Sequence, residues 1–212
     1  MFYSIIRVIV RALIYLINGK PKYLNRENLP TGNYILVGPH RTWFDPVYYA
    51  LAASPKKFSF MAKEELFKNP VIRYILNHAN AYPVNRLNPG PSAIKKPVRL
   101  LKQSDLATII FPSGSRYSDE MKGGALVIAK LANVPLVPTV YQGPLSFKGL
   151  FKRGKTTVAF GQPIEIDRHQ KLTDEYQHEL EATMQASFKQ LDQQINPNFH
   201  YVMPTKPDDD QF

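Results

Sequence analysis

Short apolar runs alternate with helical patterns along most of this 212-residue chain, and this alternation constrains the fold class. A short apolar run between turn residues is typical of a buried strand. Strands that alternate with helices predict an α/β layered domain, with a largely parallel sheet covered by helices. Predicted strands lie near residues 33–37, 58–62, 81–84, 107–111, 136–141 and 157–160. Predicted helices lie near residues 46–53, 64–77, 92–103, 123–132 and 173–195.

The composition is that of a globular protein and limits the chemistry. The chain is 44% hydrophobic and 21% charged, and its length suits one domain with a small appendage. The chain has no cysteine, which excludes disulfides, thiolate zinc sites and a cysteine nucleophile. We expect an N-terminal helix over residues 1–18, one α/β domain over 19–196 and a loosely ordered tail over 197–212.

The net charge of +10 is unevenly distributed. Residues 1–155 hold 23 Lys+Arg against 7 Asp+Glu, whereas residues 156–212 hold 4 against 10. A basic body predicts an anionic partner. The charge alone is compatible with a phosphate ligand, an anionic lipid, an acidic carrier protein or nucleic acid.

Residues 2–17 form an apolar segment interrupted by Ser4, Arg7 and Arg11. Together with Asn18, these residues recur at helical spacing, which predicts a helix with one narrow polar stripe. The helix would span roughly 24 Å, short of the roughly 30 Å hydrocarbon core of a bilayer. We interpret it as a membrane-interface helix whose two arginines reach lipid phosphates. Basic residues behind it would add attraction: Lys20, Lys22 and Arg26. The alternative is a helix that packs on the domain or pairs with a second copy.

A histidine and an aspartate lie five residues apart, directly after the first predicted strand of the domain. His40 falls at the carboxyl end of that strand, and Asp45 precedes Pro46 at the N-cap of the next helix. On one helix these side chains would point apart, so they can meet only across the strand-to-helix turn. In contact, the aspartate would fix the imidazole tautomer and make the ring a stronger base. The alternative is a helix cap beside a surface histidine.

Basic and hydroxyl side chains follow the neighbouring predicted strands. Lys63, Arg86 and Arg116 each come at or just after a strand end, and residues 113–115 read Ser-Gly-Ser. In open α/β sheets, ligands bind outside the carboxyl ends of the strands. Arginine recognises phosphate with two parallel hydrogen bonds, and a glycine turn offers backbone N–H groups. The strand ends therefore predict a site for a phosphorylated substrate.

Four ordered blocks resemble those of the lysophosphatidic acid acyltransferase family, and together they cover roughly residues 33–142. The segment 40–45, His-Arg-Thr-Trp-Phe-Asp, matches the H-x4-D block in full, and 134–138, Val-Pro-Leu-Val-Pro, matches the fourth block. Residues 80–86 resemble the second block, with Asn80 in place of its opening glycine. Lys63 and residues 122–125, Lys-Gly-Gly-Ala, also stand where the family pattern places them.

The third block departs most from the family pattern. Residues 111–116 resemble Phe-Pro-Glu-Gly-Thr-Arg, with Ser113 and Ser115 replacing the glutamate and the threonine. The first change removes a carboxylate that the family pattern carries, whereas the second keeps a hydroxyl.

The resemblance implies direct acyl transfer with His40 as the general base and Asp45 steadying the imidazolium. It implies these residues for the acceptor phosphate: Lys63, Arg86, Ser113, Gly114, Ser115 and Arg116. Backbone N–H groups near Gly114, or at the helix start after Asp45, are candidate oxyanion donors. No metal, cofactor or covalent intermediate is expected.

The implied reaction acylates the sn-2 hydroxyl of 1-acyl-glycerol 3-phosphate and gives phosphatidic acid. The donor would be a thioester of coenzyme A or of acidic acyl carrier protein, and the enzyme would lie peripherally on the cytoplasmic face of a membrane through residues 1–18. Glycerol 3-phosphate or another lysophospholipid are alternative acceptors. Two further alternatives are a serine hydrolase using Ser113 or Ser115, and a nucleic-acid binder, although no nucleic-acid motif is present.

Overall fold

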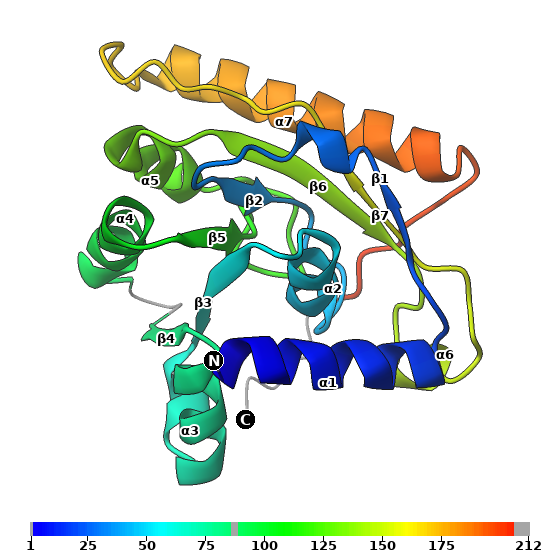
Figure 1. The fold of residues 1–212 in the computed structure, drawn as a ribbon. Helices are drawn as coiled ribbons and strands as arrows, with labels where there is room; N and C mark the ends of the chain where they lie inside the picture. Colours follow the sequence, from blue (N-terminus) through cyan, green and yellow to red (C-terminus); the bar gives the residue numbers. More distant parts are fainter. Residues whose placement is uncertain (1, 86–88, 206–212) are drawn as a thin grey trace.

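The computed structural model describes residues 2–85 and 89–205, which form a seven-stranded sheet with helices on both faces (Figure 1). The strand order is β1-β7-β6-β2-β5-β3-β4. Five neighbouring strands are parallel: β6 (Leu136–Gln142), β2 (Ile35–Val37), β5 (Leu106–Ile110), β3 (Lys57–Lys63) and β4 (Ala81–Val84). The remaining two run the other way, with β7 (Thr157–Phe160) antiparallel to β6 and parallel to β1 (Lys22–Leu24). The mostly parallel α/β sheet that the sequence predicts is confirmed.

The helices have the following bounds: α1 (Phe2–Ile17), α2 (Asp45–Ala52), α3 (Pro70–His78), α4 (Ser92–Gln103), α5 (Gly124–Ala132), α6 (Phe147–Leu150) and α7 (Asp174–Ile195). Two 3-10 turns are η1 (Arg26–Asn28) and η2 (Glu64–Phe67). Successive residues of a strand point to opposite faces of the sheet. Accordingly, Ile35 and Val37 pack in the core that α4, α5 and α7 cover, whereas Leu36 packs in the core with α2.

Three elements differ from the sequence prediction. Strand β1 was not predicted, because three residues at a sheet edge are too few to show an alternating pattern. The helix predicted over 64–77 is interrupted, because the Asn69 side chain caps a new helix by accepting the N–H groups of Val71 and Ile72 at 3.0 and 3.1 Å. Pro70 then occupies the first position of α3, where it loses no hydrogen bond. Helix α6 has one turn and was not predicted.

Helix α1 lies along the domain, with α3 near its amino end and α6 near its carboxyl end (Figure 1). Its polar stripe faces inward: Arg7 donates to the Pro55 carbonyl at 2.7 Å, and the buried Asn18 donates to Thr156 Oγ1 at 2.6 Å. One nitrogen of the Arg7 guanidinium, Nη1, is therefore bound by a backbone carbonyl of the domain, and the expectation that Arg7 and Arg11 reach lipid phosphates stays a prediction. Within the described ranges, no helix is both long and apolar enough to cross a bilayer.

The chain after α7 also differs from prediction. Residues 197–212 were expected to be loosely ordered, but the rings of Phe199 and Tyr201 pack over the guanidinium of Arg41, with ring centroids 5.1 and 5.4 Å from its Cζ. Part of the tail is therefore anchored on the turn that follows β2. Residues 206–212 lie outside the described ranges.

Candidate active site

The turn after β2 begins at a position where only glycine fits. A Cβ on Gly38 would overlap the Thr139 carbonyl of β6 and lie 2.5 Å from the Tyr49 hydroxyl. That hydroxyl donates to the same carbonyl at 2.9 Å, so α2 and β6 close tightly around the turn. The tight packing fixes where the chain leaves β2, and therefore where the next residues, Pro39 and His40, are placed.

The predicted contact between His40 and Asp45 is present, with 3.2 Å between Nδ1 and Oδ2. Asp45 is fully buried and accepts three more hydrogen bonds: from Arg41 N at 2.6 Å, Thr42 N at 2.7 Å and Thr42 Oγ1 at 2.6 Å. Its expected role as a helix cap is wrong, because the carboxylate bonds the turn before the helix. The Phe44 carbonyl instead accepts the N–H groups of the first turn of α2.

The His40 ring is fixed on its flat side as well as at its edge. It stacks on Phe111, the residue after β5, with ring centroids 4.1 Å apart and an interplanar angle of 18°. A proton on Nδ1 would bond the carboxylate, and Nε2 would then keep its lone pair for a substrate. The side chain is 10% exposed, so a small part of it reaches solvent. This arrangement can serve as a general base.

The turn after β5 is closed by its own hydrogen bonds. Gly114 has a φ of +66°, in the left-handed region, and its N–H donates to the Phe111 carbonyl at 2.8 Å. The Gly114 N–H is therefore already bonded, and so are the N–H groups that follow Asp45 in α2, because Val47 and Tyr48 both donate to the Phe44 carbonyl. Ser113 Oγ donates to the Ser115 carbonyl at 2.8 Å, and Ser115 Oγ accepts the Tyr117 N–H at 3.1 Å. In the described part of the chain, neither hydroxyl bonds His40, so the nucleophile–base contact of a serine hydrolase is not formed.

Two of the predicted phosphate-binding cations are described. Arg116 lies over the ring of Trp43, with Cζ 4.3 Å from the ring centroid, and donates to the Tyr117 hydroxyl at 3.3 Å. Lys63 ends β3 and is half-buried. Neither forms an ion pair with the described residues, so both charges are available to an anion. Arg86 lies outside the described ranges.

Sequence reasoning missed the role of Arg41, the residue after the histidine. Its buried guanidinium forms a bidentate ion pair with Asp192 of α7, at 2.9 and 2.5 Å, and donates to the Tyr141 carbonyl at 3.0 Å. Asp192 also accepts from Gln142 Nε2 at 2.8 Å. No local pattern could have revealed this pair, because 151 residues separate its members.

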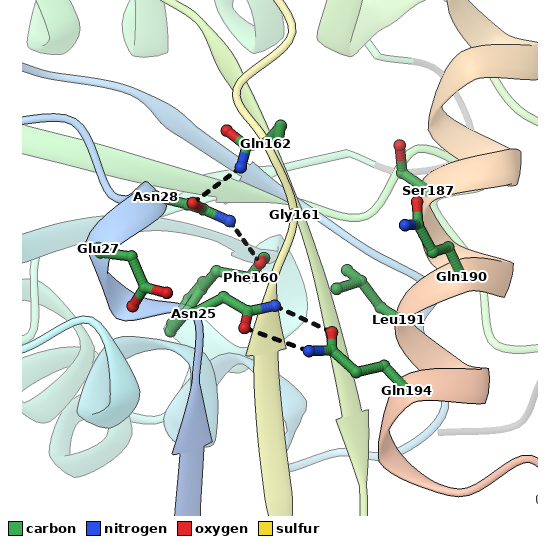
Figure 2. Close-up of a pocket in the computed structure, with 10 residues that line it drawn as sticks. All are labelled: Asn25, Glu27, Asn28, Phe160, Gly161, Gln162, Ser187, Gln190, Leu191 and Gln194. Carbon is green, nitrogen blue, oxygen red and sulfur yellow. Dashed lines mark hydrogen bonds between the residues drawn. The ribbon is translucent and has the colours of Figure 1, made fainter.

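A hollow of about 360 Å³ lies away from this site, between η1, the end of β7 and α7 (Figure 2). Because β7 is antiparallel to β6, its carboxyl end lies toward the amino ends of the parallel strands. Asn25 and Gln194 exchange amide hydrogen bonds across it at 2.9 and 3.2 Å. None of the residues that line it is basic, so it offers no charge to a phosphate: Asn25, Glu27, Asn28, Phe160, Gly161, Gln162, Ser187, Gln190, Leu191 and Gln194.

The carboxyl edge of the sheet thus combines a buried His–Asp pair with two cations, Lys63 and Arg116, that form no ion pair with the described residues. Such a site can remove a proton from a hydroxyl while cations hold a nearby anionic group. These features are those of a class of protein: an α/β enzyme whose site could activate a hydroxyl with a histidine.

Comparison with known proteins identifies the family. The model of the family described as Acyltransferase matches residues 20–142, and the chain belongs to this family. A 1-acyl-sn-glycerol-3-phosphate acyltransferase of Streptococcus pneumoniae is 46% identical over 196 residues, which are 92% of this chain and 74% of that protein. One of the same name from Bacillus subtilis is 42% identical over 155 residues, covering 72% of this chain and 77% of that protein.

A solved structure supports the fold independently. The crystal structure of the 1-acyl-sn-glycerophosphate acyltransferase PlsC from Thermotoga maritima superimposes with a TM-score of 0.64 at 20% identity. The match covers 92% of this chain and 83% of that one. The blocks that carry the sequence resemblance all fall within or beside the residues of the family match.

Proposed function

We propose that this protein transfers a fatty acyl group from an acyl thioester to the sn-2 hydroxyl of 1-acyl-glycerol 3-phosphate, which gives phosphatidic acid. The observation that carries the proposal is the 3.2 Å contact of His40 with the buried Asp45. Arg116, which forms no ion pair with the described residues, lies over Trp43 of the same turn. The names of the relatives from Streptococcus pneumoniae and Bacillus subtilis support the choice of acceptor.

The proposed step is a direct transfer. His40 Nε2 takes the proton of the acceptor hydroxyl as its oxygen attacks the thioester carbonyl carbon. The new C–O bond forms, the C–S bond breaks, and the imidazolium returns its proton to the leaving thiolate. Asp45 stabilises the transient imidazolium and keeps the ring in its tautomer. This step assigns no role to a metal, a cofactor or a covalent acyl-enzyme.

The acceptor phosphate would be bound by the cations at the strand ends. Arg116 and Lys63 carry charges that no described residue neutralises, and Arg86 is included from the sequence block alone. The Ser115 hydroxyl, which accepts the Tyr117 N–H and still has its own proton to donate, would add a contact, with Gly114 allowing close approach. Ser113 is included from the sequence block alone, because its hydroxyl already donates to the Ser115 carbonyl. Fixing the phosphate would hold the hydroxyl within reach of His40. Either coenzyme A or acidic acyl carrier protein fits the basic body as donor carrier.

We place the enzyme on the cytoplasmic surface of a membrane, with α1 lying in the interface. No residue of α1 is buried, and one face of the helix exposes only apolar side chains. The large ones are Phe2, Ile5, Val8, Ile9, Leu13 and Leu16, which are 38–68% exposed. A helix with its polar stripe bonded to the domain and its apolar side open to solvent suits the interface of a bilayer.

The apolar face extends beyond α1 at both ends. Near its amino end, Phe2 packs against Tyr74 of α3, with ring centroids 6.0 Å apart. Val71 of α3 is 66% exposed. Near its carboxyl end, Phe147 of α6 is 64% exposed. Its ring packs against Phe44 of the H-x4-D turn, with ring centroids 5.8 Å apart. The exposed apolar side chains therefore continue to the candidate active site, which suits an acceptor whose acyl chain stays in the bilayer.

A thiol-release assay tests the reaction. Coenzyme A and acyl carrier protein thioesters would each be paired with 1-acyl-glycerol 3-phosphate, glycerol 3-phosphate and another lysophospholipid. We expect turnover with the first acceptor and its loss in His40→Ala, with the far-ultraviolet circular dichroism unchanged. Substantial residual turnover in His40→Ala would show that His40 is not the base. Labelling of Ser113 by a fluorophosphonate would support a serine hydrolase instead.

Vesicle flotation tests the membrane surface. The protein is expected to float with vesicles of phosphatidylglycerol and phosphatidylethanolamine, and Val8→Asp/Leu16→Asp is expected to stay at the bottom. Leu131→Asp is the matched control, because Leu131 is 50% exposed but lies on α5, away from α1 (Figure 1). Equal flotation of all three proteins would contradict docking through α1.

A further inference from the structure

The chain reverses direction directly after α7. The Phe199 N–H donates to the Asn196 carbonyl at 3.0 Å, and the Asn198 N–H donates to Asn196 Oδ1 at 3.1 Å. Proline at the second position of a turn and asparagine at the first favour this geometry, and Pro197 cannot continue the helix. The segment then runs from the end of α7 back toward α2 (Figure 1).

Alternate side chains of this segment face the domain. Phe199 and Tyr201 are half-buried, whereas His200 and Val202 are exposed. The two inward rings lie over the Arg41 guanidinium, at 5.1 and 5.4 Å from its Cζ. A cation over an aromatic ring within about 6 Å is attracted to it, and the rings also shield the Arg41–Asp192 ion pair from water.

Arg41 connects these rings to the reacting histidine. Its backbone N–H donates to Asp45 Oδ2 at 2.6 Å, the same oxygen that His40 Nδ1 contacts. The Tyr201 hydroxyl also approaches the Arg41 carbonyl at 3.5 Å, which is long for a hydrogen bond. Whatever fixes Arg41 therefore fixes the backbone that holds Asp45.

Electrostatics also place Tyr201 near the catalytic pair. Burial raises the pKa of Tyr201, and the negative charge of Asp45 raises it further, whereas Arg41 and Arg116 lower it. The hydroxyl is therefore protonated at neutral pH. Tyr201 therefore lies within electrostatic range of both the Asp45 carboxylate and Arg116, the cation proposed to bind phosphate.

We propose that residues 196–201 form a clamp in which Phe199 and Tyr201 position the His40–Asp45 turn by covering Arg41. Both are positioning residues, because they act through Arg41 and touch no reacting atom. The clamp rests on the proposed acyl transfer, which supplies its readout. It predicts that the tail sets how well the base is aligned, and not how tightly the acceptor is bound.

Steady-state kinetics of the full chain test the clamp. For Phe199→Ala/Tyr201→Ala we expect a fall in kcat on the order of 10- to 100-fold, as for a misplaced catalytic group, with the acceptor KM unchanged. Tyr201→Phe keeps the ring and loses only the long contact, so its kcat should stay near wild type. The matched control is His200→Ala/Val202→Ala, which shortens the two outward side chains of the same segment and should behave as wild type.

A double-mutant cycle of Tyr201 and Arg41 distinguishes a positioning role of the ring from a general loss of stability. Because the rings act through Arg41, Tyr201→Ala should cost little further kcat in an Arg41→Ala background, whereas additive losses would overturn the clamp. If the double alanine variant fails to fold, Tyr201→Leu removes one ring and serves in its place. A raised acceptor KM at unchanged kcat would also overturn the clamp. Absence of turnover in wild type would refute the proposed function itself, whereas an active wild type with unaffected clamp variants would refute the clamp alone.

Discussion

Arg41 belongs to the His40–Asp45 turn and Arg116 lies over Trp43 of the same turn, but the surroundings of the two guanidinium groups differ. Arg41 is 8% exposed, with a bidentate carboxylate, a backbone carbonyl and two rings around its guanidinium. Arg116 is half-buried and has two aromatic neighbours and no carboxylate among the described residues. One charge is already neutralised by the protein, and the other is left for a ligand.

The difference distinguishes Arg41, which stabilises the structure of the site, from Arg116, which is available to bind a ligand. A buried arginine costs free energy unless it is paired, so Arg41 and Asp192 depend on each other. An arginine stacked on an exposed ring keeps several N–H donors directed at solvent, where a phosphate can bind them. Both residues stand in or beside the family blocks, so their type alone does not distinguish their roles.

The largest effect is expected from breaking the Arg41 pair. Asp192→Ala leaves the Arg41 guanidinium buried without its carboxylate, which should lower the free energy of unfolding by about 3 kcal/mol. Urea denaturation measures this loss, and kcat should fall with it because the turn loses its anchor. Asp192→Asn keeps one acceptor and should lose less. If Asp192→Ala were as stable as wild type, the Arg41 pair would not anchor the turn.

A smaller effect, of a different kind, is expected at Arg116. Arg116→Ala removes hydrogen bonds to a charged phosphate, worth roughly 1.5–3 kcal/mol, which corresponds to a rise of about 10- to 150-fold in the acceptor KM. The free energy of unfolding should change by less than about 0.5 kcal/mol, as for most surface substitutions. Kinetics across acceptor concentrations check the first value, and urea denaturation the second. A fall in kcat at constant KM would place Arg116 with Arg41 as a residue that builds the site.

Much of the candidate site was predictable from the sequence because of one topological rule. The carboxyl ends of parallel strands meet at one edge of a sheet, so side chains that follow β2, β3 and β5 had to gather there. β2, β5 and β3 are neighbouring parallel strands, so the strand ends that precede His40, Arg116 and Lys63 do lie at one edge of the sheet. For His40 and Asp45, the sequence indicated that the two could meet only across the strand-to-helix turn, and the structure shows that contact.

What was not predicted depends on contacts between distant segments or on the choice between two faces. The helical period of α1 revealed a polar stripe, and such a stripe usually faces water. Its inward orientation is decided by partners elsewhere in the chain: the Pro55 carbonyl for Arg7 and Thr156 for Asn18. The anchoring of the tail likewise depends on a distant residue, Arg41. The Asn-Pro-Asn sequence after α7 does indicate a turn there.

The smallest effect is expected from substitution of Trp43, which should change the acceptor KM alone. The ring supports Arg116 at 4.3 Å, and a cation–π contact at an exposed site is worth about 0.5–1 kcal/mol. Trp43→Ala should therefore raise the acceptor KM by about two- to fivefold, with Trp43→Phe intermediate, and kcat should be unchanged. In an Arg116→Ala background the same substitution should have no further effect on KM.

Trp43 is 58% exposed, so its ring could instead contact the membrane. The two roles separate when the acceptor is offered both in vesicles and as monomers in detergent. A ring that supports Arg116 raises KM equally in both, because the phosphate contact is the same. An effect confined to vesicles would assign Trp43 to the apolar face that α1 and α6 share, and Arg116 would then be aligned by Tyr117 alone.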